Sequence, residues 1–195
     1  VYKRQFKGDV KLHIEVTDPE NNKTYSGLEE VWYDVKASGN VVKEVRYPSL
    51  VDNSANPVKG NQSWSGDITI PAAEYNSNDV KVQVHARDFS GNVYDSEIVP
   101  LKIDITHPTI AVTYDLNTPL NERYYKDVRT ATVVVTERNF DESAVRFNIT
   151  NTDGTQPAIS GWTHSANAGV SDDATHTCQV TFAADGDYTF TPVSY

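Results

Sequence analysis

The 195-residue sequence predicts an all-β protein that folds as two β-sandwich modules with antiparallel sheets. Three observations lead to this fold class. Apolar and polar residues alternate with a period of two in many short runs, which is the pattern of half-buried strands. Turn-forming residues separate these runs at intervals of roughly 8–12 residues, as in sandwiches and barrels. Helical signals are confined to two short segments, 71–75 and 141–144.

The first half of the chain contains strand-like runs separated by turn signals. Ser38-Gly39-Asn40 lies between two of these runs and predicts a hairpin. Asp88-Phe89-Ser90-Gly91-Asn92 predicts a turn, because glycine and asparagine tolerate positive φ. Pro100 interrupts the last run, since proline removes a hydrogen bond from the ladder of a sheet. The predicted strands are Val10–Val16, Val31–Val35, Val41–Val45, Trp64–Ile70, Val80–Ala86 and Ser96–Ile105.

The strand pattern starts again after 104–110, a short segment that Pro108 stiffens. We therefore expect module 1 to span 1–105 and module 2 to span 106–195. The β-branched run Thr130–Glu137 predicts a central strand. Asp185-Gly186 predicts a hairpin turn that leads into 187–190. The other predicted strands of module 2 are Ile110–Tyr114, Val145–Thr150 and Thr175–Phe182.

The two halves resemble each other weakly. Val10–Val16 and Thr132–Glu137 share a pattern and a place in their modules, and Trp64 sits before a strand much as Trp162 does. A repeat of roughly 100–120 residues is typical of an immunoglobulin-like module with its linker. We therefore expect two tandem immunoglobulin-like sandwiches, of which the second lacks its last strand. Methionine is absent even at position 1, and the sequence ends in a strand-like run, so we expect a fragment.

Composition narrows the range of partners. The formal net charge is −10, and an acidic chain is repelled by phosphate backbones and anionic lipid surfaces. We therefore do not expect nucleic acid binding. We do not expect membrane insertion either, since no apolar run is long enough to span a bilayer. The single cysteine, Cys178, has no partner for an intramolecular disulfide and lies in no metal-binding motif. Its place in an alternating run predicts a small buried side chain.

Several motifs, in this order, resemble a known family. They are Asp104-Ile-Thr-His-Pro-Thr-Ile110, Tyr124-Tyr125-Lys126, the run 129–141 and Asp185-Gly-Asp-Tyr-Thr-Phe190. Together they resemble the bacterial Ig-like repeats of large surface and adhesin-like proteins of Gram-positive gut bacteria. A module of that family closes with an Asp-x-x-Gly-Asn turn, to which Asp88–Asn92 is similar. The resemblance implies an extracellular setting, on the cell surface or secreted, and a structural or adhesive role as spacer, stalk or interaction domain. Its implied partners are neighbouring modules of the chain and a host protein or glycan.

No constellation for catalysis emerges from the sequence, so we expect a non-catalytic protein without a cofactor. The five histidines are dispersed, and no nucleophile, phosphate-binding or zinc motif is present. Calcium is the one metal that the acidic loops favour, because it binds six to eight carboxylate and carbonyl oxygens. We expect Asp88, Asn92 and Asp104 to meet near the module junction as its ligands. The alternative is that Asp88 and Asn92 only stabilise a turn.

Aromatic residues suggest a second kind of site. Exposed aromatic rings stack on sugars and anchor protein interfaces. Tyr124 and Tyr125 lie in a polar loop and are the predicted ligand-binding pair, whereas Trp64 and Trp162 are expected in the cores. This pair keeps open an alternative function, an accessory carbohydrate-binding module of a secreted glycan-degrading enzyme.

Overall fold

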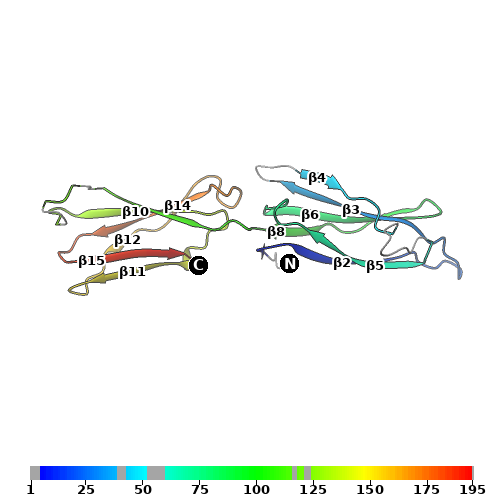
Figure 1. Cartoon of the computed structure of the whole chain (residues 1–195), viewed down its shortest axis with the longest axis horizontal. Coiled ribbons are helices and arrows are strands. Elements are labelled where there is room, and N and C mark those ends of the chain that lie inside the picture. The colour runs from blue at the N-terminus through cyan, green and yellow to red at the C-terminus, as the bar shows by residue number, and fades with distance from the viewer. Residues whose placement is uncertain (1–4, 39–42, 52–59, 116–117, 121–123, 195) are drawn as a thin grey trace. The chain divides into compact units, whose positions relative to one another are not determined.

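The structure is a computed structural model that describes residues 5–38, 43–51, 60–115, 118–120 and 124–194. The chain forms two compact units, unit 1 (Val1–Ile105) and unit 2 (Thr106–Tyr195). Each unit consists of two layers of β-strands (Figure 1). The predicted all-β, sandwich-type fold is confirmed. No helix in the described ranges is long and apolar enough to cross a membrane.

The described residues of unit 1 form eight strands: β1 Gln5–Phe6, β2 Val10–Thr17, β3 Leu28–Ser38, β4 Lys43–Arg46, β5 Ser63–Ile70, β6 Asp79–Asp88, β7 Val93–Asp95 and β8 Val99–Ile103. One sheet has the order β1-β8-β6-β3-β4, with β7 also paired to β6, and β2 and β5 form the other. The pairs are antiparallel except for β1 and β8, which run parallel. The predicted antiparallel pairing therefore holds in this unit apart from one short parallel pair at the sheet edge.

The core of unit 1 follows directly from alternation along its strands. Val31 and Val35 on β3, and Val80 and Val82 on β6, are fully buried. They face the buried side chains of β2 and β5 across the sandwich, in one continuous cluster. Burying each such side chain contributes roughly 1.5–3 kcal/mol. Trp64 also belongs to this core, as predicted.

In the part of unit 2 that the structure describes there are seven strands: β9 Thr109–Tyr114, β10 Arg129–Thr136, β11 Val145–Asn151, β12 Ala158–Ile159, β13 Thr163–His164, β14 Thr175–Phe182 and β15 Tyr188–Ser194. One sheet has the order β12-β14-β10-β9, with β13 also paired to β14, and β11 and β15 form the other. All of these pairs are antiparallel. The predicted helical segment at 141–144 is a short 3-10 helix, Glu142–Ala144.

The core of unit 2 is smaller. Ala131, Val133, Cys178 and Val180 are buried on β10 and β14. The layer that covers them is aromatic and only half-buried, with Phe147 on β11 and Phe190 on β15 among its members. Trp162 packs against this cluster as expected, although it lies between β12 and β13.

The segment Asp185-Gly186 forms a corner between sheets, and the hairpin predicted there is wrong. The strand before it, β14, pairs with β10, whereas the strand after it, β15, pairs with β11 in the facing sheet. The Tyr188 hydroxyl donates to the carbonyl of Ala184 at 3.2 Å. This contact is a tyrosine corner, the feature that marks the start of strand F in immunoglobulin-type sandwiches.

Three further sequence predictions differ in detail. The expected likeness between Trp64 and Trp162 does not hold. Trp64 lies within β5, which pairs with β2, and the strand of unit 2 with the equivalent pairing is β14, which pairs with β10. Trp162 lies outside β14. The last strand of unit 1 continues through Pro100 and breaks at 96–98 instead. There the Ser96 hydroxyl accepts a hydrogen bond from the Val84 amide at 3.0 Å. A side-chain oxygen thus takes the place of a backbone carbonyl as the acceptor for this amide. The hairpin residues Gly39 and Asn40 lie outside the described ranges, although β3 and β4 pair.

The tyrosine corner predicts the effect of one substitution. Tyr188→Phe removes the hydroxyl and leaves the Ala184 carbonyl without this donor. We expect a loss of about 1 kcal/mol in the free energy of unfolding of unit 2, or roughly 4–8 °C in its Tm. Thermal unfolding followed by circular dichroism measures this. Tyr124→Phe, at an exposed ring of the same unit, is the matched control, and an equal loss in both variants would contradict the assignment.

Burial of Cys178 predicts an unreactive thiol. The side chain is 1% exposed, and desolvation raises the pKa of this thiol to about 11. At pH 8 the thiol therefore stays protonated, and the thiolate that attacks disulfide reagents is scarce. We expect negligible reaction with an aromatic disulfide reagent in buffer and one thiol per chain in guanidinium. Rapid labelling of the folded chain at pH 8 would show that this core is open.

Candidate functional site

A pocket opens at one end of unit 1, between its two sheets. Its volume is about 320 Å³. The apolar floor comes from Val16, Leu28 and Ala86, and Val93 and Tyr94 of β7 form an exposed rim. We call it the end pocket; its other lining residues are Thr17, Asp18, Pro19, Arg87, Asp88 and Asn92.

The rim projects into solvent because β7 is short and lies at the edge of its sheet. Tyr94 pairs with Ala86, an inward-facing residue of β6, so the tyrosine stands on the pocket side of the sheet. Its ring is nevertheless 71% exposed. Phe89, in the neighbouring turn, is 52% exposed. This end of unit 1 therefore presents aromatic surface beside an apolar floor.

The carboxylate of Asp18 holds one wall of the end pocket. It accepts hydrogen bonds from the amides of Ser26 at 3.0 Å and Gly27 at 2.8 Å, and from the Ser26 hydroxyl at 3.1 Å. Gly27 has a φ of 85°, and a Cβ there would run into the carbonyl of Gly60. The wall thus depends on glycine at 27 and on a carboxylate at 18.

Asp88 and Asn92 close the opposite wall as a turn. The Asp88 carboxylate accepts the Asn92 amide and the Asn92 side-chain NH2, both at 2.8 Å. These hydrogen bonds, first among them that from the Asn92 side chain, lower the pKa of Asp88 below its usual value. The amide of Phe89 donates to the Gly27 carbonyl at 3.0 Å and ties the two walls together.

Asp104, the third predicted calcium ligand, lies elsewhere in unit 1. It is buried, and its amide donates to the Phe6 carbonyl at 2.9 Å. The amide of the preceding residue, Ile103, donates to the carbonyl of Ser77, which lies just before the start of β6. Asp88 is the last residue of that strand. At roughly 3.3 Å per residue, β6 separates the two carboxylates by more than about 25 Å. Asp88 and Asn92 are therefore brought together as a turn, and Asp104 does not join them.

The metal-binding geometry that was expected is not assembled. No group of three or more histidine, cysteine, aspartate or glutamate side chains among the described residues is arranged to hold a metal ion. The charged lining residue Arg87 is also engaged, with its Nε 2.7 Å from a Glu29 oxygen and an Nη 3.1 Å from Glu30. The charged groups around the end pocket thus hold its walls, and its free surface is apolar and aromatic.

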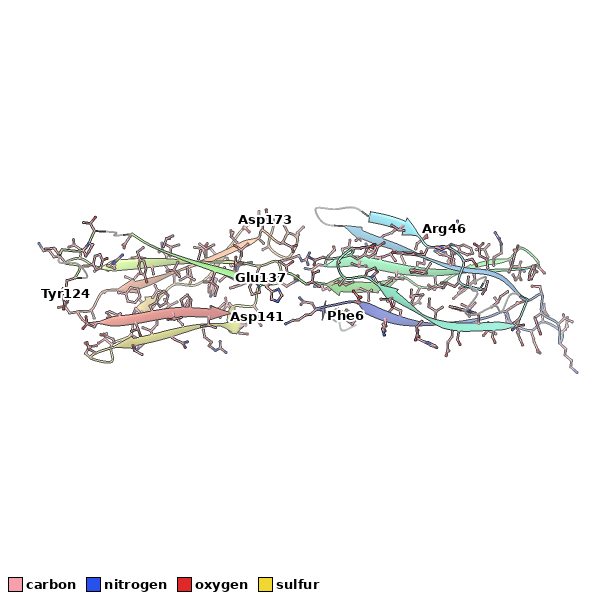
Figure 2. All side chains as sticks on the ribbon, viewed as in Figure 1. Phe6, Arg46, Tyr124, Glu137, Asp141 and Asp173 are labelled. Atoms are coloured by element: carbon pink, nitrogen blue, oxygen red, sulfur yellow. The ribbon has the colours of Figure 1, made fainter. Side chains whose placement is uncertain are left out.

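Tyr124 and Tyr125 lie at one end of unit 2, and the structure separates their roles. Tyr124 is 58% exposed, and Figure 2 shows it at the end of the unit opposite Glu137, Asp141 and Asp173. Tyr125 is half-buried because the Arg129 guanidinium lies 3.6 Å from its ring centre. The same guanidinium is 4.7 Å from the ring of Tyr114. Tyr125 is therefore part of a cation–π stack, and Tyr124 presents the freer ring.

Sequence reasoning missed a pair of histidines in unit 2, the buried His176 and the exposed His164. His176 is 2% exposed, and its Nε2 lies 2.7 Å from the carbonyl oxygen of Glu137. Because a carbonyl only accepts, Nε2 carries a proton, and in the neutral ring Nδ1 accepts from His164 Nδ1 at 2.8 Å. Phe140 stacks on the His176 ring at 4.2 Å. The sequence signal for it is that residue 176 shares the inward-facing side of an alternating strand with Cys178 and Val180.

An aromatic cluster also covers the outer face of the larger sheet in unit 1. Trp32 projects from β3 away from the core, yet is only 9% exposed. His85 stacks on it at 5.2 Å, and the Arg46 guanidinium lies 4.5 Å from its ring centre. Asp95 and Asp34 flank His85 at 2.7 and 3.4 Å. Such contacts cover the tryptophan, so this face offers less free aromatic surface than the end pocket.

No protein-family model matches the chain, and neither does any curated protein sequence. What the chain does therefore has to be inferred from its own surfaces.

The turn at Asp88 predicts a pH-dependent stability. Asp88→Ala removes both hydrogen bonds to Asn92, so we expect a lower Tm for unit 1 at pH 7. Because folding depresses the pKa of this carboxyl, its contribution is complete above the ordinary value near 3.8 and is lost as the pH falls through the depressed value. The difference between wild type and variant should therefore shrink in thermal melts taken from pH 5 down to pH 2.

The exposed Glu97 supplies the control for this series. Glu97→Ala makes the same change in net charge within unit 1, and we expect its Tm to follow that of wild type across the pH range. A Glu97→Ala curve that matches Asp88→Ala would assign the effect to net charge and not to the turn.

Proposed function

We propose that the chain is a non-catalytic segment of a bacterial extracellular protein, cell-surface or secreted, whose sandwich modules space that protein and bind a partner. The end pocket of unit 1 carries this proposal. Its carboxylates and its arginine pair with groups of the chain itself, so they are engaged in holding the walls. The apolar floor and the Tyr94 ring are therefore the groups that a partner can contact.

This arrangement suits recognition by shape and apolar contact. An exposed aromatic side chain beside an apolar pocket is the usual anchor of a protein interface. The net charge of −10 favours a neutral or basic partner over an acidic one. The resemblance to Ig-like repeats of Gram-positive surface proteins supports the extracellular setting and the spacing role. In that setting the partner is a host protein, and neighbouring modules of the same chain are further partners.

Binding to extracellular proteins tests the proposal. The full chain is applied to immobilised collagen, fibronectin, laminin and mucin, and binding is followed by surface plasmon resonance. We expect saturable binding to at least one of them and a loss of about tenfold or more in affinity for Tyr94→Ala, since an aromatic anchor contributes at least 1.4 kcal/mol.

Tyr124→Ala is the matched control, because it removes an exposed tyrosine from the other unit. The proposal predicts that this variant binds as wild type does. Equal loss in both variants, or no binding to any of the four proteins, would count against the end pocket as the recognition site.

A second candidate function is glycan binding by an accessory module of a secreted glycan-degrading enzyme. The exposed ring of Tyr124, beside the stack of Tyr125, Arg129 and Tyr114, favours it, because sugars stack on such rings. A glycan array separates the two candidates. Sugar binding that Tyr124→Ala abolishes and Tyr94→Ala preserves would support this second function. An array without signal would remove it.

A further inference from the structure

Two histidines of unit 2 meet across neighbouring strands. His164 on β13 and His176 on β14 are directly opposite each other in the antiparallel register, so their side chains lie on the same face of the sheet. Their Nδ1 atoms are 2.8 Å apart, and their ring centres are 5.0 Å apart. The pair thus brings two imidazole nitrogens to one point at the edge of the sheet.

His176 is held in the way that a metal-binding histidine usually is. Its Nε2–H donates to the Glu137 carbonyl at 2.7 Å, and Phe140 stacks on its ring with an angle of 8° between the planes. A histidine that binds a metal through one nitrogen typically donates its other N–H to a carbonyl or carboxylate, which fixes the tautomer and the ring orientation. The Nδ1 atom of His176 is therefore the fixed donor of the pair.

His164 supplies the second donor and the access from solvent, because its side chain is exposed. In the neutral pair its Nδ1–H donates to Nδ1 of His176. A metal ion takes the place of that proton when the His164 ring carries its proton on Nε2 instead. This change of tautomer leaves the number of bound protons the same. The exposed ring then has only to turn until its Nδ1 lone pair points at the ion.

The distance between the two nitrogens favours one class of ion. Two nitrogens at about 2.0 Å from an ion are about 2.8 Å apart when they bind at a right angle and about 3.3 Å apart at a tetrahedral angle. The observed 2.8 Å matches the right angle. Square-planar and tetragonal nitrogen coordination is typical of Cu²⁺ and Ni²⁺, whereas structural zinc sites are tetrahedral. Cu²⁺ also binds such donors most tightly among the divalent first-row ions.

The surroundings of the pair limit it to two protein ligands and favour a cation. Within the described part of the chain, no third histidine, cysteine, aspartate or glutamate joins them in a metal-binding group, so water or an external ligand fills the other positions. Figure 2 shows Glu137, Asp141 and Asp173 at the same end of unit 2. Carboxylates raise the local concentration of cations, and the net charge of −10 acts in the same direction.

We propose that His164 and His176 form a two-histidine site for a divalent late transition-metal ion, with Cu²⁺ as the preferred ion. The two Nδ1 atoms are its protein ligands, and the Glu137 carbonyl and the Phe140 ring hold His176 in place. The inference goes beyond the proposed function, because it concerns unit 2 and makes no use of the end pocket.

Titration of the full chain with copper tests the site. Cu²⁺ is added as its iminodiacetate chelate, so that a site with two donors outcompetes single surface histidines, and binding is followed by quenching of tryptophan fluorescence. Trp162 reports on the site, because its ring centre lies 4.8 Å from that of Phe140, which stacks on His176. We expect saturation at one ion per chain. Electron paramagnetic resonance spectra should show coupling of the copper to two imidazole nitrogens.

Two variants locate the ion. His164→Ala removes an exposed ring and one donor, so we expect an unchanged circular dichroism spectrum and copper binding that is weaker by at least about tenfold. His13→Ala is the matched control and should bind copper as wild type does, because it removes an exposed histidine of unit 1 that lies beside Asp67 and Glu15. Wild-type affinity in His164→Ala, an equal loss in His13→Ala, or coupling to a single nitrogen would overturn the proposal. So would the absence of saturable binding by the wild-type chain.

Discussion

Burial of one face of each sheet against the facing sheet holds each unit together, and the rest of the structure depends on it. With a single cysteine, the chain has no intramolecular disulfide to join its layers. Stability must come from side chains such as Val31, Val35, Val80 and Val82, which alternation places on the inner faces. Their burial fixes the register of the strands, because a shift by one residue turns every apolar side chain outward.

The ends of the sandwich are where this constraint relaxes. Strands stop there, and the loops between them satisfy their backbone amides with side chains. Asp18 and Asp88 serve this purpose in unit 1, which leaves their neighbours Val93 and Tyr94 free to face solvent. In unit 2 the buried ring of His176 finds partners in the Glu137 carbonyl and the exposed His164 ring. Surface for binding arises beside such loops, since the loops need not fill the core.

The two units cover their cores to different extents. Unit 1 encloses its core between a six-stranded sheet and the β2–β5 layer, and most of its core valines have no exposed surface. Unit 2 covers its core with β11 and β15, whose aromatic side chains are only half-buried. Phenylalanine and tyrosine cover more area per residue than valine does, which lets two strands shield a small core in part.

The sequence by itself predicted the longer strands, their core positions and a division near residue 105, because each depends on local alternation and turn residues. It did not indicate the short strands β1, β7, β12 and β13. It also identified the turn at Asp88 and Asn92, which is closed by contacts within five residues. Only the tertiary structure decided which strands share a sheet. Asp185-Gly186 is suited to a hairpin locally, yet β14 and β15 enter different layers because each buries its apolar face against the other sheet. The pairing of strands that are distant in the sequence also sets which loops meet. It places Asp18 at the end pocket and keeps Asp104 away from Asp88.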